Sequence, residues 1–175
     1  MPLRAGKKET AYRAGTLDVS QPCVPIPLMP APIRIGTQGW NYDAWVGPFY
    51  PEGTRPVDFL RVYARAFDTV EVDSTFYAIP APRTLRDWAE RVPDEFQFAL
   101  KMPQEITHES RLRNVAPALD QFFERARELG PKLGPVLVQL GPDFAPNELP
   151  ALATFLPLLP RREGRRRVPS AWVDS

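Results

Sequence analysis

The chain has 175 residues, of which 43% are hydrophobic and 25% are charged, and these values fit one domain of modest size. Its formal net charge of +1 gives no overall attraction to nucleic acid or to an anionic membrane. No apolar run approaches the length of a membrane span, and no apolar core of a signal peptide follows the basic first residues. The single cysteine, Cys23, excludes an internal disulfide. We therefore expect a cytoplasmic protein.

Proline divides the chain into three parts. The 22 prolines cluster near both ends and between the periodic segments. We expect residues 1–32 to form a proline-rich, disordered extension, because proline breaks helices and central strands. A peptide motif for an aromatic groove is the alternative. Residues 33–160 carry the apolar periods of a folded domain, and residues 161–175 form an arginine-rich, irregular tail.

Strand and helix patterns alternate from residue 33 onward. In chain order, the apolar periods predict a strand at 33–37, a helix at 56–67, a strand at 69–73, a helix from 82 to about 92, a strand at 96–101, a helix at 115–129, a strand at 136–140 and a helix at 147–159. Four strand–helix units in succession predict an α/β fold with a parallel sheet and right-handed crossovers.

The connections that follow the predicted strands are long, at 38–55, 74–82, 102–114 and 141–146. Long loops at the carboxyl ends of parallel strands hold the ligand sites of barrels and open sheets. The chain lacks both the glycine-rich dinucleotide fingerprint and the phosphate-binding G-x-x-x-x-G-K-[ST] motif. We therefore expect a TIM-barrel-like fold with only about four β/α units, a half-barrel, rather than a nucleotide-binding sheet.

The strand at 69–73 carries the most informative pattern of the chain. Val70 and Val72 share one face, and Glu71 and Asp73 share the other. Buried carboxylates need partners, and such faces often mark a site. In a barrel this face is the interior, which Gln97, Gln139 and Lys101 would join, with Gly36 leaving space. Lys101 beside Glu71 or Asp73 would offset the cost of burying either charge.

Two explanations of this polar face remain open. It is either a structural plug that fixes the strand register, or a catalytic site. In the second case Glu71 and Asp73 act as acid or base, and Lys101 stabilises charge. His108, the single histidine, is a catalytic candidate or a solvated loop residue.

The loops supply candidate binding residues. Trp40, Tyr42 and Trp45 make the first long loop aromatic, which indicates either core packing or a stacking platform for a sugar or base. Tyr77 follows the acidic strand, and Arg111 is placed to hold an anion. One histidine without ligand spacing argues against a metal site, and no particular cofactor is indicated.

Five motifs resemble the YecE-like family, the domain of unknown function numbered 72. They are Ile35–Trp40, Trp45–Pro51, Phe67–Tyr77, Phe96–Lys101 with Ile106–His108, and Leu133–Leu140. The resemblance covers residues 33 to about 160. It implies a TIM-barrel-like fold of undetermined biochemistry, with a distant likeness to endonuclease-type and sugar-isomerase-type barrels. At position 73 the family pattern has Asn, where this chain has Asp73.

The resemblance implies a fifth strand after residue 160, where this chain has arginine runs instead. We therefore expect a truncated gene product whose open sheet edges favour self-association. Three functions remain open: an enzyme-derived barrel that binds a small polar or phosphorylated ligand, a nucleic-acid-binding or nuclease-like barrel, and a truncated chain without activity. The residues do not decide whether the protein is an enzyme.

Overall fold

The structure is a computed structural model that describes residues 33–160. The expected extension at 1–32 and the expected tail at 161–175 lie outside the described residues. Within 33–160, no helix is long and apolar enough to cross a membrane.

Three parallel strands form one sheet in the order β1–β2–β3. The strands are β1 (Thr69–Val72), β2 (Gln97–Lys101) and β3 (Leu133–Leu137). The α-helices are α1 (Pro56–Tyr63), α2 (Ser74–Tyr77), α3 (Pro82–Glu90), α4 (Ala116–Ala126) and α5 (Leu149–Phe155). Short 3₁₀ segments lie at Asp43–Trp45, Arg127–Lys132, Pro146–Glu148 and Leu156–Leu158, and a π-helix lies at Glu105–Glu109. The α/β class and the parallel sheet are therefore confirmed.

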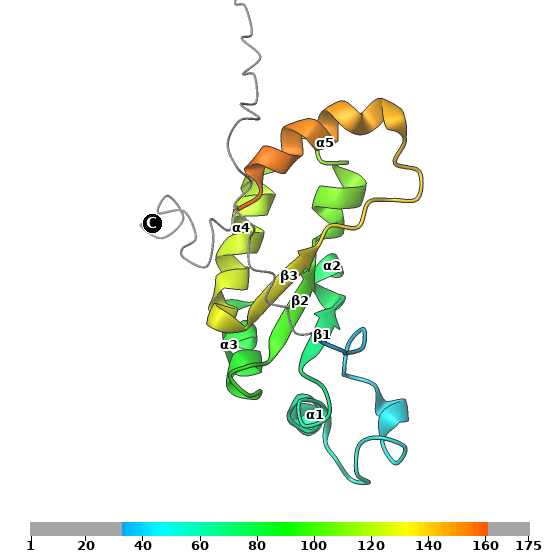
Figure 1. Ribbon diagram of the computed structural model, residues 1–175, viewed down its shortest axis with the longest axis vertical. Coiled ribbons are helices and arrows are strands. Elements are labelled where there is room, and N and C mark those ends of the chain that lie inside the picture. Colours follow the sequence, from blue (N-terminus) through cyan, green and yellow to red (C-terminus); the bar gives the residue numbers. More distant parts are fainter. Residues whose placement is uncertain (1–32, 161–175) are drawn as a thin grey trace, which may run out of the picture. The chain divides into compact units, whose positions relative to one another are not determined.

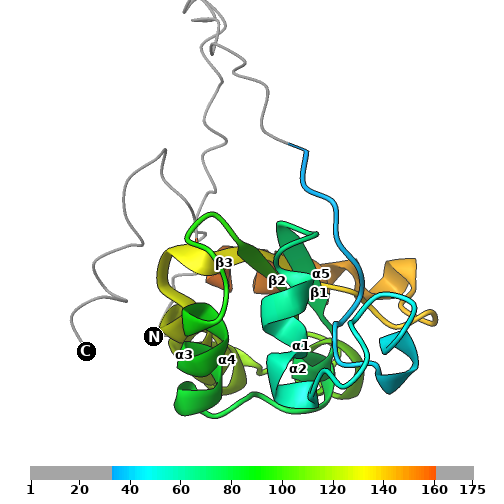
Figure 2. The same ribbon diagram turned by 90° about the horizontal axis from the view of Figure 1, so that it is seen from below.

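Each of the three main helices begins with a proline in its first turn, where the missing N–H has no intrahelical acceptor to lose. Figure 2 shows α1, α3 and α4 on one side of the sheet. The apolar residues of these helices then meet the sheet at helical spacing. The buried members are Phe59, Leu60, Tyr63, Leu85, Leu119, Phe122, Phe123 and Ala126.

The two faces of the sheet differ as the alternation predicts. Val70 and Val72 of β1, and Phe98 and Leu100 of β2, are buried against the helices. The alternate residues of both strands are only half-buried. Figure 1 shows the three strands side by side, with α2 at the carboxyl end of β1. The second face of the sheet, where Glu71 and Lys101 lie, is thus the more open one.

The strand expected at 33–37 does not form. Instead, Gln38 makes an isolated parallel bridge to Glu71. The Glu71 N–H donates to the Thr37 carbonyl at 3.0 Å, whereas the Thr37 N–H donates to the Tyr63 hydroxyl at 2.8 Å. Because a side chain takes this backbone donor, the segment cannot extend a full ladder along β1. Gly36 is required here, since a Cβ atom would lie 2.1 Å from the Thr69 carbonyl oxygen.

The last strand lies earlier than the expected 136–140. β3 spans Leu133–Leu137, and its register against β2 shifts between Phe98 and Leu100. Between these pairs β2 advances by two residues, from Phe98 to Leu100, while β3 advances by three, from Leu133 to Val136, which is a β-bulge. The bulge takes up Pro135, whose missing N–H would otherwise interrupt the ladder. The predicted strand at 136–140 began after this proline, three residues later than β3 begins.

Candidate functional site

The carboxyl ends of β1 and β2 are tied together by one buried threonine. The 74–82 connection, expected as a loop, begins with the short helix α2. Thr75 lies on that helix with no exposed surface. Its hydroxyl lies 2.8 Å from the Val72 carbonyl and 2.7 Å from the Lys101 carbonyl, and its single proton is shared between these two acceptors. The hydroxyl therefore fixes α2, and the residues it carries, against the end of β2.

Phe76 is the centre of the group that this arrangement creates. The Lys101 Nζ lies 4.6 Å from the centroid of the Phe76 ring. The His108 ring meets the same phenyl ring edge-on at 4.9 Å, and the Tyr77 ring lies 5.2 Å from it. Tyr77 itself is 72% exposed. Three of the residues predicted for the site, Lys101, His108 and Tyr77, are thus brought together around a phenylalanine that was not predicted.

The contacts of His108 favour one tautomer. Its Nδ1 lies 2.9 Å from the Thr107 hydroxyl, and that hydroxyl donates to the Pro103 carbonyl at 3.1 Å. A hydroxyl that has given its single proton to a carbonyl can only accept from the ring nitrogen. With the Thr107 proton on the Pro103 carbonyl, Nδ1 is the donor of the neutral ring and Nε2 is the acceptor. A Cβ atom on Gly141 would lie 3.8 Å from Nε2, so a residue without a side chain faces this nitrogen.

Lys101 does not pair with Glu71 or Asp73 as expected. Among the ion pairs of residues 33–160, none involves Lys101, Glu71 or Asp73. Glu71 does lie on the same face of the sheet, opposite Ala99 of β2. Asp73 does not, because β1 ends at Val72 and Asp73 turns into helical geometry at φ −76° and ψ −22°. The ammonium of Lys101 rests on the Phe76 ring instead, a favourable cation–π geometry.

Arg111 is held by carboxylates rather than left free for an anion. Its Nη1 donates to Asp143 at 2.8 Å and its Nε donates to Glu148 at 2.7 Å, while its Nη2 also donates to Glu148. Arg113 adds a further bond to Glu148 at 3.2 Å. The hydrogen bond from Arg111 is the main reason that the pKa of Glu148 falls to about 2. The same bonds raise the pKa of Arg111 above its ordinary value.

Unusual backbone geometry surrounds this ion-pair network. The 102–114 connection contains the π-helix Glu105–Glu109, and then Arg111, Leu112 and Asn114 adopt positive φ angles of 48°, 65° and 56°. Such strain in residues other than glycine costs free energy and tends to collect at functional sites. Here the Glu148 contacts and the burial of Leu112 hold it in place. His108 lies within the π-helix, and the residues with positive φ begin three positions after it.

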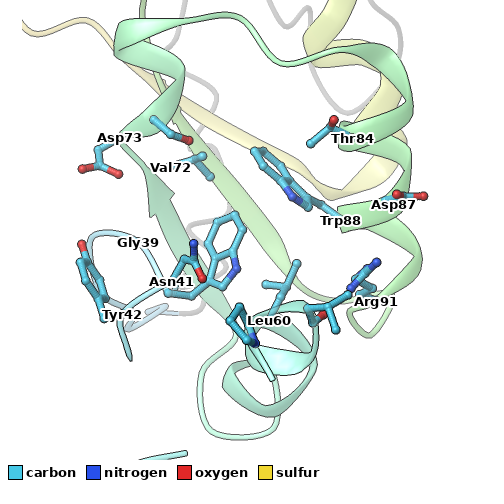
Figure 3. A pocket seen from close by; sticks show the side chains of 14 residues that line it. Gly39, Asn41, Tyr42, Leu60, Val72, Asp73, Thr84, Asp87, Trp88 and Arg91 are labelled. Carbon is cyan, nitrogen blue, oxygen red and sulfur yellow. The ribbon is translucent and has the colours of Figure 1, made fainter. Parts of the chain in front are cut away.

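A separate pocket of about 470 Å³ lies on the helix side of β1. It gathers three other predicted site residues, Trp40, Tyr42 and Asp73. Figure 3 shows Asp73 and Tyr42 on one side and Asp87 and Arg91 of the α3 region on the other. Thr84 and Trp88 of α3 also line it, together with Asn41 and Leu60. Six of the ten predicted residues therefore divide between two places, the Phe76 group and this pocket.

Four predicted residues join neither place: Glu71 and Arg111, described above, and Trp45 and Gln139. Trp45 packs against the rings of Tyr42, Phe49 and Tyr50, at centroid distances of 4.8, 5.7 and 5.9 Å. Gln139 is exposed beyond the end of β3. Tyr50 is fully buried, and its hydroxyl donates to the Trp40 carbonyl, which anchors the first aromatic loop. Burial raises the pKa of Tyr50 to about 12. Binding roles for Trp45 and Gln139 stay predictions.

Sequence reasoning missed the residues that organise these two places and the Arg111 ion-pair network. They are Thr75, Phe76, Asp143, Glu148, Thr84, Asp87, Trp88 and Arg91. Phe76 stands inside the Phe67–Tyr77 motif, and its position four residues after the end of β1 was the available signal. Among residues 33–160, no three His, Cys, Asp or Glu side chains are grouped so that they could hold a metal ion.

Comparison with known proteins places the chain in a family. The family model described as "Protein of unknown function DUF72" matches residues 34–169. The UPF0759 protein YecE of Escherichia coli strain K12 is 37% identical over 128 residues, which are 73% of this chain and 44% of that protein. The UPF0759 protein YunF of Bacillus subtilis is 33% identical over 119 residues, 64% of this chain and 41% of that protein. The chain thus spans less than half the length of these curated relatives.

Solved structures agree with this assignment. A DUF72 family protein from Thermotoga maritima superimposes with a TM-score of 0.64 at 25% identity, over 73% of this chain and 52% of that chain. A DUF72 family protein from Enterococcus faecalis gives a TM-score of 0.58 at 22% identity, over 71% of this chain and 46% of that chain, and supports the fold alone. The resemblance expected from the five motifs is confirmed, and the chain belongs to the DUF72 family.

Proposed function

We propose that the Phe76 group binds the anionic part of a small polar ligand, such as a phosphorylated metabolite, at the carboxyl ends of the strands. One observation carries the proposal. Lys101 and His108 converge on the Phe76 ring, and the ammonium of Lys101 has no carboxylate partner among residues 33–160. A half-buried cation without a counter-ion at the carboxyl end of a parallel sheet is a suitable anion site.

Each side chain of the Phe76 group has a different chemical role in this proposal. The Lys101 ammonium supplies a positive charge that stabilises an anionic oxygen, and Nε2 of His108 can exchange a proton with the ligand. Glu71, lower on the same face, is the candidate second acid or base. Arg111 plays a supporting role in this scheme, because its guanidinium is already occupied by Glu148 and Asp143. Ligand binding by the Phe76 group is the main proposal, and catalysis by an enzyme-derived barrel is secondary to it.

Calorimetric titration tests the binding. Inorganic phosphate and a small phosphomonoester, glycerol phosphate, serve as probes at fixed ionic strength. Lys101→Gln should weaken phosphate binding about tenfold or more, since a charge-assisted hydrogen bond is worth roughly 1.5–3 kcal/mol. Arg65→Gln is the charge-matched control, because Arg65 is exposed in the turn between α1 and β1, at the opposite end of the sheet from Lys101. Equal weakening in both variants would reject the proposal.

The nucleic-acid alternative has a distinct signature. An oligonucleotide neutralises several cations at once, so its affinity falls steeply with salt, whereas one phosphate on Lys101 gives a shallow dependence. Trp45, one candidate for base stacking, is already packed against three neighbouring rings. No described contact therefore favours this alternative over the small anion.

We also propose that the described sheet is half of a TIM-barrel-like fold. The segment that bridges at Gln38 stands where a first strand would pair with β1, which gives four parallel positions in chain order. Within residues 33–160, β3 pairs on one side only, and exposed apolar side chains lie on and after it: Leu137, Leu149, Leu156 and Leu158. Such an edge invites another strand, including that of a second copy. Multi-angle light scattering that finds only monomer over a wide concentration range would argue against self-association.

A further inference from the structure

The pocket beside β1 has walls that the Phe76 proposal does not use. It lies over Val72, between α1 and α3, and the first aromatic loop closes one side. Val72 faces the helices, so the pocket is on the opposite face of the sheet from Lys101. Its volume of about 470 Å³ falls in the range of small-molecule sites. Figure 3 shows the indole of Trp88 between its two polar sides.

The aromatic walls are held rigidly. Trp40 meets Trp88 edge-on at 5.1 Å, and Trp88 stacks on Phe98 of β2 at 6.2 Å. The Trp40 carbonyl accepts a hydrogen bond from the buried Tyr50. The Tyr42 hydroxyl donates to the Gln38 carbonyl at 2.7 Å, which leaves its ring as part of the wall. Three aromatic side chains thus line the pocket, each held by a neighbouring ring or by its own hydroxyl hydrogen bond.

Five of the polar side chains of the walls have no partner within the part of the protein that the structure describes. Within residues 33–160, no hydrogen bond or ion pair is made by the side chains of Asn41, Asp73, Ser74, Thr84 or Asp87. Asp73, Thr84 and Asp87 are half-buried, so their shielding from water is only partial and a ligand can reach them. The single basic residue of the wall, Arg91, donates its Nη1 to the Val57 carbonyl. The lining therefore presents two carboxylates against one guanidinium.

We propose that this pocket binds a small organic cation, a primary or quaternary amine that also carries a hydroxyl or amide group. Indole and phenol rings attract a cation through their faces, by about 0.5–2 kcal/mol each. The carboxylate of Asp73, with Trp40 and Tyr42, would hold the ammonium, and the polar groups of Asp87 and Thr84 would take the hydrogen-bonding end. The same carboxylates repel phosphate, so this site and the Phe76 group would accept opposite charges.

Tryptophan fluorescence gives a direct test. The probes are choline and its uncharged isostere 3,3-dimethylbutan-1-ol, titrated into the full chain at fixed ionic strength. We expect choline to change the emission of Trp40 and Trp88 saturably, and the isostere to bind at least tenfold more weakly. Equal binding of the two probes, or no saturable change with choline, would overturn the proposal.

Matched variants locate the site. Asp73→Asn and Asp87→Asn should each weaken choline binding several-fold, whereas Asp120→Asn, an exposed change on α4, should not. Asp73 makes no side-chain cap bond to α2, so Asp73→Asn removes charge without removing a structural hydrogen bond. Circular dichroism and thermal melting verify that each variant folds. If all three variants bind alike, the cation is not in this pocket. Phosphate titration of the same variants tests the Phe76 proposal separately, since Asp73→Asn should leave phosphate affinity unchanged.

Discussion

Replacing Thr75 with valine should loosen the junction on which the Phe76 group is built. Valine has nearly the shape of threonine, so Thr75→Val removes the hydroxyl without opening a cavity. The hydroxyl is fully buried and lies within hydrogen-bond distance of the Val72 carbonyl, at 2.8 Å, and of the Lys101 carbonyl, at 2.7 Å. Loss of a net hydrogen bond costs about 1 kcal/mol, and a buried acceptor left without a partner raises the total to about 1–3 kcal/mol.

Urea unfolding measures this cost. With a slope of about 2 kcal/mol per molar urea for a domain of this size, a loss of about 2 kcal/mol lowers the midpoint by about 1 M at unchanged slope. Thr75→Ser is the control, because it keeps the hydroxyl and loses only a methyl group, worth about 1 kcal/mol. We expect Thr75→Val to be the less stable of the two. A valine variant as stable as the parent would refute the idea that this hydroxyl joins β1, α2 and β2.

Two further predictions concern the charge of Glu148 and the close backbone approach at Gly36. The pKa of Glu148 lies at about 2 rather than 4.5, so the stability that its charge contributes is complete above pH 4.5 and is lost as the pH falls toward 2. As the pH is lowered over this range, the melting temperature should therefore fall more for the parent than for Glu148→Gln. Parallel plots of melting temperature against pH would mean that the Arg111 network does not cause the loss of stability in acid. Gly36→Ala places a methyl group 2.1 Å from the Thr69 carbonyl oxygen. Overpacking of this kind costs about 1–3 kcal/mol, so the melting temperature should fall, and an unchanged value would mean that residues 33–38 do not lie against β1.

The sequence predicted the layered fold well because buried apolar residues recur along the chain with the period of the strand or helix that carries them. Val70 and Val72, or Phe98 and Leu100, take the helix-facing side of their strands as expected. The failures occur where a single backbone group finds another partner. Thr37 donates to the Tyr63 hydroxyl, and Pro135 is absorbed by a bulge. Neither the hydrogen bond nor the bulge produces a periodic pattern in the local sequence that could have revealed it.

The candidate site was predicted by residue type more successfully than by geometry. Lys101 and His108 do lie at the carboxyl end of the sheet, but they meet through Phe76, an apolar residue that a search for charged side chains passes over. Asp73 was assigned to the strand by alternation, and it left that face because β1 ended one residue earlier. Arg111 was expected to meet a ligand, whereas its partners, Asp143 and Glu148, lie more than thirty residues away along the chain. Long-range pairing of this kind depends on the tertiary fold.

The imidazole of His108 offers the most direct measurement of the proposed anion site. Because the chain has one histidine, its ring signals in a proton–carbon NMR spectrum need no assignment. On addition of inorganic phosphate at constant pH and ionic strength, we predict a saturable shift of these signals that Lys101→Gln abolishes and Arg65→Gln preserves. Signals that do not move with phosphate in the parent protein, or that move equally in the Lys101→Gln variant, would contradict an anion site formed by Lys101 and His108.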